Sequence, residues 1–155
     1  MRCRHLLRET LAGQLAPAQV IGDDDEAQLA RYLADPAARL LIWEDAAPLG
    51  FAIFREIGEA SGRVELFRLA LSGAGKGGGA AFMTALIDFA FEKLQAKRLW
   101  LDASSENLRA QKLYERVGFT LEGQLRQHWY RPALGYAVDL MLYGLMRDKW
   151  CSAKA

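Results

Sequence analysis

Short apolar runs dominate the first half of the chain. Residues 40–43 and 50–54 are rich in strand-forming side chains and are separated by a turn-like segment, so together they predict a hairpin. A third strand is predicted over 63–71, and the basic start of the chain, 1–8, favours a first strand. These strands predict an antiparallel meander.

One helical pattern interrupts the meander. Leu29, Tyr32 and Leu33 are spaced by three and four residues, which marks one face of a helix. The acidic run 23–26 precedes them. Within it, Asp23 can cap the helix and the acid three residues later can complete a capping box, so the run is interpreted as a helix start and not as a metal site.

Helices and strands alternate in the second half. The longest helical pattern covers 77–96, and a second helix is predicted over 106–117, where Gly118 supplies the left-handed residue that often ends a helix. Apolar runs predict strands over 99–101, 119–125 and 138–145, with a connection over 127–135. The pattern predicts one mixed α/β domain spanning 1–155.

Composition and charge narrow the possible partners. The chain is 52% hydrophobic and 25% charged with a formal net charge of +1, which favours a globular protein without a general attraction to nucleic acid or anionic lipid. No apolar run approaches the about 20 residues that a membrane span requires. Cys3 and Cys151 have no His or Cys at ligand spacing, so we expect free thiols, no metal and a cytoplasmic protein.

The most informative stretch lies between the third strand and the longest helix. Four of the five residues 75–79 are glycines. Without Cβ atoms the backbone can lie against a ligand, and the free amides at the start of the next helix favour phosphate oxygens. The stretch therefore predicts a cofactor that carries phosphate.

Several kinds of glycine loop compete for this stretch. A Walker loop fails, because Gly77 stands where Ser or Thr must bind magnesium. Gly73, Gly75 and Gly78 have the spacing of a dinucleotide fingerprint, and Asp102 follows at a suitable distance. That fingerprint belongs in a first βαβ unit, whereas a meander precedes it here. A flexible glycine turn without a ligand is the remaining alternative.

Two motifs resemble the signatures of the GNAT superfamily of acyltransferases. Segment 75–79 resembles the loop that binds pyrophosphate in that family, with Ala74 where the family pattern has Arg or Gln. Segment 107–119 resembles the second signature, an Asn, Ala and Leu-Tyr helix that ends in Gly-Phe. The tail, 122–150, is similar to the ribosomal-protein N-terminal acetyltransferase subgroup. The resemblance covers 63–150 well and the preceding residues in outline.

The resemblance implies a GNAT fold, in which about four helices flank a mostly antiparallel mixed sheet of about six to seven strands. It also implies acetyl-CoA as co-substrate and a primary amine as acceptor, either a protein N-terminus or a small molecule, on a monomer or homodimer. The implied cofactor-binding residues are Leu69, Ala70, Leu71, Gly75, Lys76, Gly77, Gly78, Gly79, Ala80, Asn107, Ala110 and Tyr114.

Two residues are candidates for proton transfer. Glu65 lies on the strand that leads into the glycine loop, where similar enzymes often carry a general base, but it could instead be an exposed carboxylate paired with Arg63 or Arg68. Tyr114 could protonate the leaving thiolate, or it could be a core aromatic residue. The backbone near 69–71 can polarise the thioester carbonyl.

The chain shows no arrangement typical of a covalent relay, so direct transfer in a ternary complex is the simplest mechanism. The acceptor mouth is predicted at the cluster of Arg126, His128, Trp129, Tyr130, Arg131 and Tyr136, which could equally be a solvated loop. Two alternatives to the enzyme stay open at this point, a non-catalytic module that binds acyl-CoA and a nicotinamide-dependent oxidoreductase.

Overall fold

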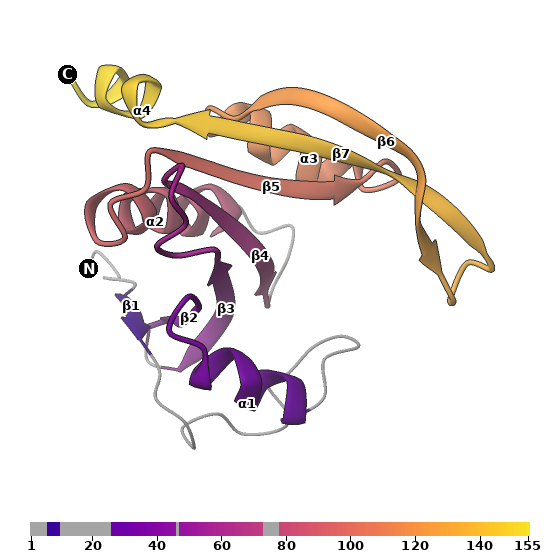
Figure 1. The fold of residues 1–155 in the computed structure, drawn as a ribbon, viewed down its shortest axis with the longest axis horizontal. Coiled ribbons are helices and arrows are strands. Elements are labelled where there is room, and N and C mark those ends of the chain that lie inside the picture. Colours follow the sequence, from indigo (N-terminus) through magenta and orange to yellow (C-terminus); the bar gives the residue numbers. More distant parts are fainter. Residues whose placement is uncertain (1–5, 10–25, 46, 73–77) are drawn as a thin grey trace.

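The computed structural model describes residues 6–9, 26–45, 47–72 and 78–155 (Figure 1). The described strands are β1 (Leu6–Glu9), β2 (Arg39–Glu44), β3 (Pro48–Arg55), β4 (Arg63–Leu71), β5 (Arg98–Ser104), β6 (Thr120–Arg131) and β7 (Tyr136–Met146). The described helices are α1 (Glu26–Ala34), α2 (Gly78–Glu92), α3 (Leu108–Arg116) and α4 (Arg147–Lys154).

The strands form one sheet in the order β1-β2-β3-β4-β5-β7-β6. Strands β4 and β5 are parallel, and every other neighbouring pair is antiparallel. The predicted fold class is therefore confirmed: a mostly antiparallel mixed sheet with four helices. This order also rules out the doubly wound parallel sheet that the dinucleotide interpretation requires.

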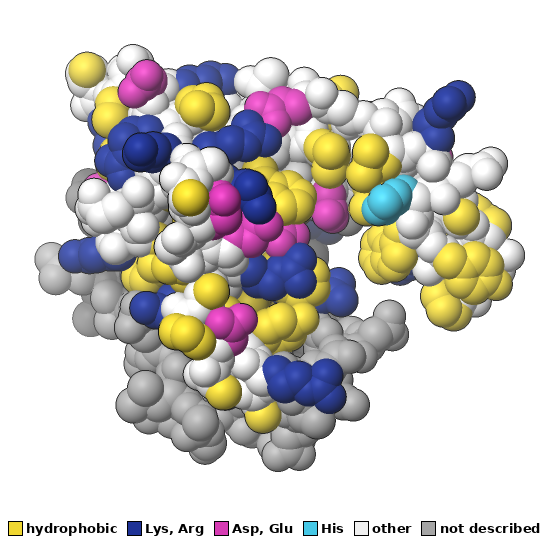
Figure 2. All heavy atoms as spheres, in the orientation of Figure 1, with side chains coloured by type: hydrophobic (Ala, Val, Ile, Leu, Met, Phe, Trp, Pro, Cys, Tyr) yellow, Lys and Arg dark blue, Asp and Glu magenta, His cyan; other side chains and the backbone are white. Residues whose placement is uncertain are grey.

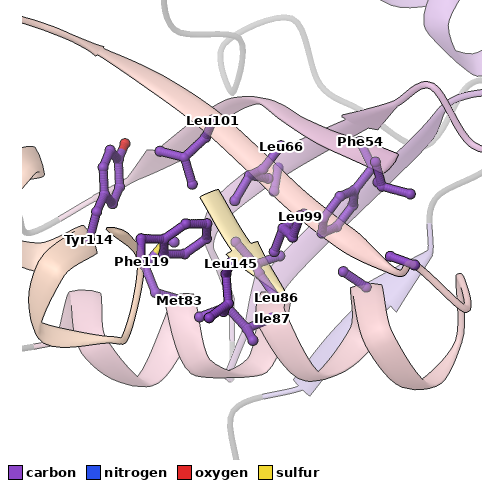
Figure 3. Packing of buried hydrophobic residues seen from close by; sticks show 14 of the residues in the cluster. Phe54, Leu66, Met83, Leu86, Ile87, Leu99, Leu101, Tyr114, Phe119 and Leu145 are labelled. Atoms are coloured by element: carbon purple, nitrogen blue, oxygen red, sulfur yellow. The ribbon is translucent and has the colours of Figure 1, made fainter. Parts of the chain in front are cut away.

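The two faces of the sheet carry separate hydrophobic cores. On one face α2 and α3 pack against the strands around Leu99, Leu101 and Phe119, and Figure 3 shows this cluster together with Tyr114 at its edge. On the other face α1 covers the β2–β3 part of the sheet through Tyr32. No residue of β5 belongs to this smaller core, so the face of β5 on the α1 side of the sheet is available for a site.

Several element boundaries differ from the sequence predictions, and the largest differences are in the second half of the chain. Helix α2 ends at Glu92, not at 96, because the chain turns at Gln95, whose φ of 55° lies in the left-handed region. Helix α3 begins at Leu108, since Asn107 serves as its cap. Strand β6 continues to Arg131 through two register shifts, where a connection was expected, and α4 has no counterpart among the predicted elements.

Strands β4 and β5 separate soon after they begin. They pair only from Arg63 to Glu65 on β4, opposite Arg98 to Trp100 on β5. On its other edge β4 pairs with β3 up to Leu71, with a register shift that leaves Phe67 as an extra residue. Such a bulge increases local twist, and Figure 1 shows the two strands diverging. The result is a gap in the middle of the sheet.

Within the described ranges, none of the helices is both long and apolar enough to cross a membrane.

Candidate active site

A cavity of about 780 Å³ opens on the α2–α3 side of the gap. We call it cavity 1. Its walls are the end of β4, the first turns of α2 and one side of α3, with Leu69, Gly78, Gly79 and Ala110 in the lining. The N-terminal amides of α2 lie beside this space, and such amides have no partner within their own helix. An anionic group bound in cavity 1 would be stabilised by them.

Cavity 1 is strongly cationic. Arg109, Lys112 and Arg116 line it from α3, at a spacing that places them along one helix face. No carboxylate from the described part of the chain joins that lining. These three cations are not among the site residues predicted from the sequence. Their spacing is visible in the sequence, but only the packing of α3 shows that this face borders a cavity.

A second cavity, of about 540 Å³, lies on the opposite face of the sheet, and we call it cavity 2. It is lined by Phe67, Arg68, Asp102, Ser104, Glu106, Tyr114, Trp129, Arg131 and Leu134, among others. The hairpin of β6 and β7 forms its outer wall. Figure 2 shows a hollow between the body of the molecule and the tip of this hairpin, beside a face on which acidic and basic side chains are mixed.

The two cavities meet at the gap in the sheet. Leu69 and Asn107 line both of them. In the part of the chain that the structure describes, the edge of β4 that faces β5 has no pairing strand beyond Glu65, so alternate backbone groups of that stretch point into the gap. An extended ligand in cavity 1 could therefore hydrogen-bond this edge and present its end to cavity 2. This is the arrangement that the predicted role of 69–71 requires.

Helix α3 supplies three of the predicted site residues. The side chain of Asn107 accepts a hydrogen bond of 3.1 Å from the Ala110 amide and so caps the helix. Ala110 lines cavity 1 and Tyr114 lines cavity 2. The side-chain Nε2 of Gln111 donates to the carbonyl oxygens of Ser104 and Ser105, at 3.0 and 3.1 Å, and fixes α3 to the end of β5.

Not every predicted cofactor-binding residue can be placed. Gly75, Lys76 and Gly77 lie outside the described residues. Ala80 follows the two described glycines at the start of α2, but it is not among the residues that line cavity 1. At Gly79 an added Cβ would lie 3.2 Å from the side chain of Leu113, so the small residue lets α2 and α3 approach closely beside the cavity.

The hydroxyl of Tyr114 is a hydrogen-bond donor over the whole physiological pH range. The ring is 6% exposed and packs against Phe119 and Tyr143. Burial, followed by the charge of Asp102 and the neighbouring Tyr143, raises the pKa of Tyr114 to about 12. Complete proton transfer to a thiolate whose thiol has a pKa of about 8.5 is therefore uphill by about 5 kcal/mol. Donation of a hydrogen bond is the more accessible role.

Glu65 is a buried ion-pair partner. Its neighbours Val64 and Leu66 belong to the main core, so its side chain points to the opposite face of the sheet. It is 4% exposed, and the Nε and Nη2 atoms of Arg55 lie 2.8 and 2.7 Å from its Oε2. The partner is thus Arg55, neither of the arginines considered from the sequence. Neither described cavity includes Glu65 in its lining.

The pKa of Glu65 reflects two opposing influences. Burial raises the pKa of its carboxyl group, and the hydrogen bond and charge of Arg55 lower it by less. The net direction is upward from the ordinary value of 4.5. That Glu65 acts as a general base stays a prediction, and the structure adds that its carboxylate is already engaged.

The predicted acceptor cluster is only partly assembled. Trp129 and Arg131 line cavity 2, and the guanidinium of Arg131 lies 4.3 Å from the centre of the Trp129 ring. The Tyr136 hydroxyl donates a 2.6 Å hydrogen bond to Glu106 and so ties the hairpin to the body of the protein. The other members of the cluster do not line either described cavity.

Comparisons with known proteins identify the family of this chain. The model of the acetyltransferase (GNAT) family matches residues 4–119. An uncharacterized N-acetyltransferase, p20, of Bacillus licheniformis is 28% identical over 112 residues, which cover 72% of this chain and 62% of that protein. A putative ribosomal N-acetyltransferase of Bacillus subtilis, YdaF, is 28% identical over 107 residues, covering 68% and 57%. The chain spans about three fifths of the length of these relatives.

Solved structures share the fold. Spermidine/spermine N-acetyltransferase SpeG from Vibrio cholerae, in complex with manganese ions, superposes with a TM-score of 0.82 at 21% identity over 98% of both chains. Spermidine N-acetyltransferase from Vibrio cholerae in complex with CoA and spermine gives 0.80 at 21% identity, covering 95% of this chain and 98% of that one. At these identities the likeness concerns the fold.

The ion pair beside the gap leads to a pH-dependent prediction. Because the folded-state pKa of Glu65 is raised, its ionisation opposes folding as the pH rises past 4.5. Replacing Arg55 by methionine removes the group that lowers this pKa. We expect Arg55→Met to lower the free energy of unfolding by about 2 kcal/mol at pH 7. This value lies between the contribution of an exposed ion pair and the cost of breaking a buried one. The loss should be much smaller at pH 4, where Glu65 is protonated.

Urea unfolding of variant and wild type at both pH values measures this difference. Arg63→Met is a matched control, because Arg63 pairs with the partly exposed Glu56 and Glu59, and its loss should be much smaller at pH 7. An Arg55→Met deficit that is equal at pH 4 and pH 7 would contradict the electrostatic explanation.

Proposed function

Because the chain belongs to the acetyltransferase (GNAT) family, we propose that it transfers the acetyl group of acetyl-CoA to a primary amine by direct attack in a ternary complex. The observation that carries this proposal is the meeting of two cavities, on opposite faces of the sheet, at Leu69 and Asn107. Acetyl-CoA can enter through cavity 1 and the amine through cavity 2, so that the two substrates meet beside these two residues.

Cavity 1 suits the donor. CoA carries phosphate groups at one end and a thioester on a long, flexible arm at the other. The amides at the start of α2 and the cations Arg109, Lys112 and Arg116 favour the phosphates. The unpaired edge of β4 favours the amide groups of the arm and would bring the thioester carbonyl to Leu69.

The chemistry then needs three things from this chain. The nitrogen lone pair of the amine attacks the carbonyl carbon, so the amine must be neutral. The carbonyl oxygen gains negative charge, which backbone N–H groups of the β4 edge can stabilise. The carbon–sulfur bond breaks and the sulfur takes a proton, and the Tyr114 hydroxyl can stabilise that sulfur by a hydrogen bond while it carries charge. The products are the acetylated amine and CoA.

The charge of cavity 2 favours an acceptor with a single positive charge. Asp102 and Glu106 can attract an ammonium group, but Arg68 and Arg131 line the same space and would repel a polycation. An α-amine at the start of a peptide fits this mixture, because it carries one charge followed by neutral peptide groups. The similarity of the tail to the ribosomal-protein subgroup supports the same choice. A polyamine would place further ammonium groups near the arginines.

An acceptor screen tests this proposal. Release of CoA thiol from acetyl-CoA should be fastest with peptides that have a free α-amine, and it should disappear when that amine is blocked. Spermidine and small drug-like amines are the comparison acceptors. Faster turnover of one of these than of every peptide would overturn the choice of acceptor, and binding of acetyl-CoA without transfer to any amine would overturn the enzyme.

The donor assignment predicts the effect of a substitution at Gly78. An added Cβ there would meet only Leu71 in the described structure, at 3.8 Å, so the fold should tolerate it. The two methyl groups of valine would project into cavity 1 and block the backbone approach. We expect Gly78→Val to weaken CoA binding by about tenfold or more in calorimetry.

Gly123→Val is the control for that experiment, since Gly123 lies on β6 with nothing within 4 Å of an added Cβ and does not line either described cavity. Unchanged CoA affinity in a folded Gly78→Val protein would be incompatible with CoA in cavity 1.

A further prediction concerns the leaving group. Tyr114→Phe keeps the buried ring and removes the hydroxyl, so acetyl-CoA affinity should stay near wild type while kcat falls. A hydrogen bond to a charged group contributes about 1.5–3 kcal/mol, which corresponds to a loss of about ten- to a hundredfold. In the control Tyr143→Phe, the hydroxyl removed lies near Gln111 and Glu115, not in either cavity. If kcat is unchanged in Tyr114→Phe, the hydroxyl has no part in the reaction.

A further inference from the structure

We propose that Asp102 is the general base that takes the proton from the acceptor amine, in place of Glu65. This inference rests on the proposed function. It assigns a residue to the deprotonation of the amine, a step for which the proposed function names no residue. In the sequence, Asp102 stood out only as the acid of a dinucleotide fingerprint, an interpretation that the sheet order excludes.

The position of Asp102 follows from strand alternation. Leu101 and Ala103 are buried in the main core, so the side chain between them points to the opposite face of β5 and lines cavity 2. Trp100 is the last residue of β5 that pairs with β4, and Asp102 lies two residues farther along the strand. It therefore borders the gap at which an acetyl group from cavity 1 would emerge.

Asp102 and Glu65 differ in access. Asp102 is exposed to solvent within cavity 2, whereas Glu65 is 4% exposed, and its Oε2 accepts a hydrogen bond from Nε of Arg55 and forms an ion pair with Nη2 of the same residue. A proton placed on Glu65 would weaken that ion pair, and Glu65 is not among the residues that line cavity 2. Among the described residues, Asp102 takes part in no salt bridge that a proton would weaken in this way.

The surroundings of Asp102 suit proton exchange with an amine. The charged and titratable groups that face it come from five elements or loops: Arg55 on β3, Arg68 and Glu65 on β4, Tyr114 on α3, His128 and Arg131 on β6, and Glu106 before α3. The walls of the cavity remove part of its hydration and raise the pKa of its carboxyl group, while Arg68, Arg55 and His128 lower it by less. An efficient base has a pKa near the working pH, so a raised pKa makes the Asp102 carboxylate a better base at neutral pH.

The proton balance of the step is simple. An α-amine has a pKa of about 8 and arrives mostly as the ammonium form at neutral pH. The ammonium gives one proton to the Asp102 carboxylate, which later returns it to solvent. The neutral amine attacks the thioester, and the second proton that the nitrogen loses ends on the CoA sulfur.

The test compares Asp102→Asn with Glu65→Gln over a range of pH, with a peptide α-amine as acceptor. Asparagine keeps the size of the side chain and cannot accept the proton. For Asp102→Asn, kcat/KM should fall by about 10²-fold at pH 7, and the deficit should shrink as rising pH supplies neutral amine. Affinity for CoA and the thermal midpoint should stay near wild type. Glu65→Gln should change stability and keep the shape of the wild-type pH profile.

Two outcomes would overturn the assignment. One is an Asp102→Asn protein with the wild-type pH profile, and the other is a pH-dependent loss in Glu65→Gln of the kind expected for Asp102. Both require an active wild-type protein. If the wild type acetylates no amine, the proposed function fails instead, so the two failures are distinguishable.

Discussion

The separation of β4 from β5 is the constraint on which the rest of the structure depends. If the parallel pairing continued along both strands, the backbone groups of residues 66–71 would be satisfied within the sheet and no passage would connect its faces. The strands are instead joined only near their start, where the carbonyl of Gly62 accepts from the amide of Lys97 at 2.8 Å. The extra residue Phe67 then turns β4 away while it stays paired with β3. One bulge thus creates both cavities.

The ion pair of Arg55 and Glu65 lies at the point where the strands part. Residues 55 and 65 are paired across β3 and β4, and residue 65 is also in the last register pair with β5. The cation of Arg55 lies 3.5 Å from the centre of the Phe67 ring, so it contacts the bulge as well as the carboxylate. A buried pair of this kind adds little net stability. Its position suits a role in fixing the geometry of the strands at this point. A hydrophobic pair would tolerate more arrangements of the two strands, because its contacts have no preferred direction.

The sequence was most informative where a local signal has a local cause. The bounds of β4 were predicted without error, since 63–71 is rich in strand-forming apolar residues and lies between glycine-containing loops. The helix that carries Asn107 and Tyr114 was found because its cap, its periodicity and its terminal Gly-Phe are all contained in thirteen residues. The second of these segments, together with the glycine loop 75–79, carried the resemblance to the family that the family model confirms.

The parts that escaped prediction depend on register and packing. The partner of Glu65 lies on another strand, and its identity depends on a bulge that no local pattern marks. The position of Asp102 beside cavity 2 depends on where parallel pairing stops. The C-terminal end of helix α2 was predicted four residues too far along the chain, because Gln95 adopts a left-handed conformation that its residue type does not favour.

The separation of charge across the sheet follows from the same gap. Three cations line cavity 1, while cavity 2 combines the carboxylates of Asp102 and Glu106 with arginines. An anionic donor and a cationic acceptor in one cavity would attract each other in arbitrary arrangements, and each would compete for the protein groups meant for the other. With the sheet between them, an anionic donor would meet the three cations of cavity 1, and, among the described residues, the carboxylates that favour a cationic acceptor would lie only in cavity 2. The described linings of the two cavities share only Leu69 and Asn107, and neither residue carries a charge, so on the proposed function the backbone of β4 and not the ions would orient the reacting atoms.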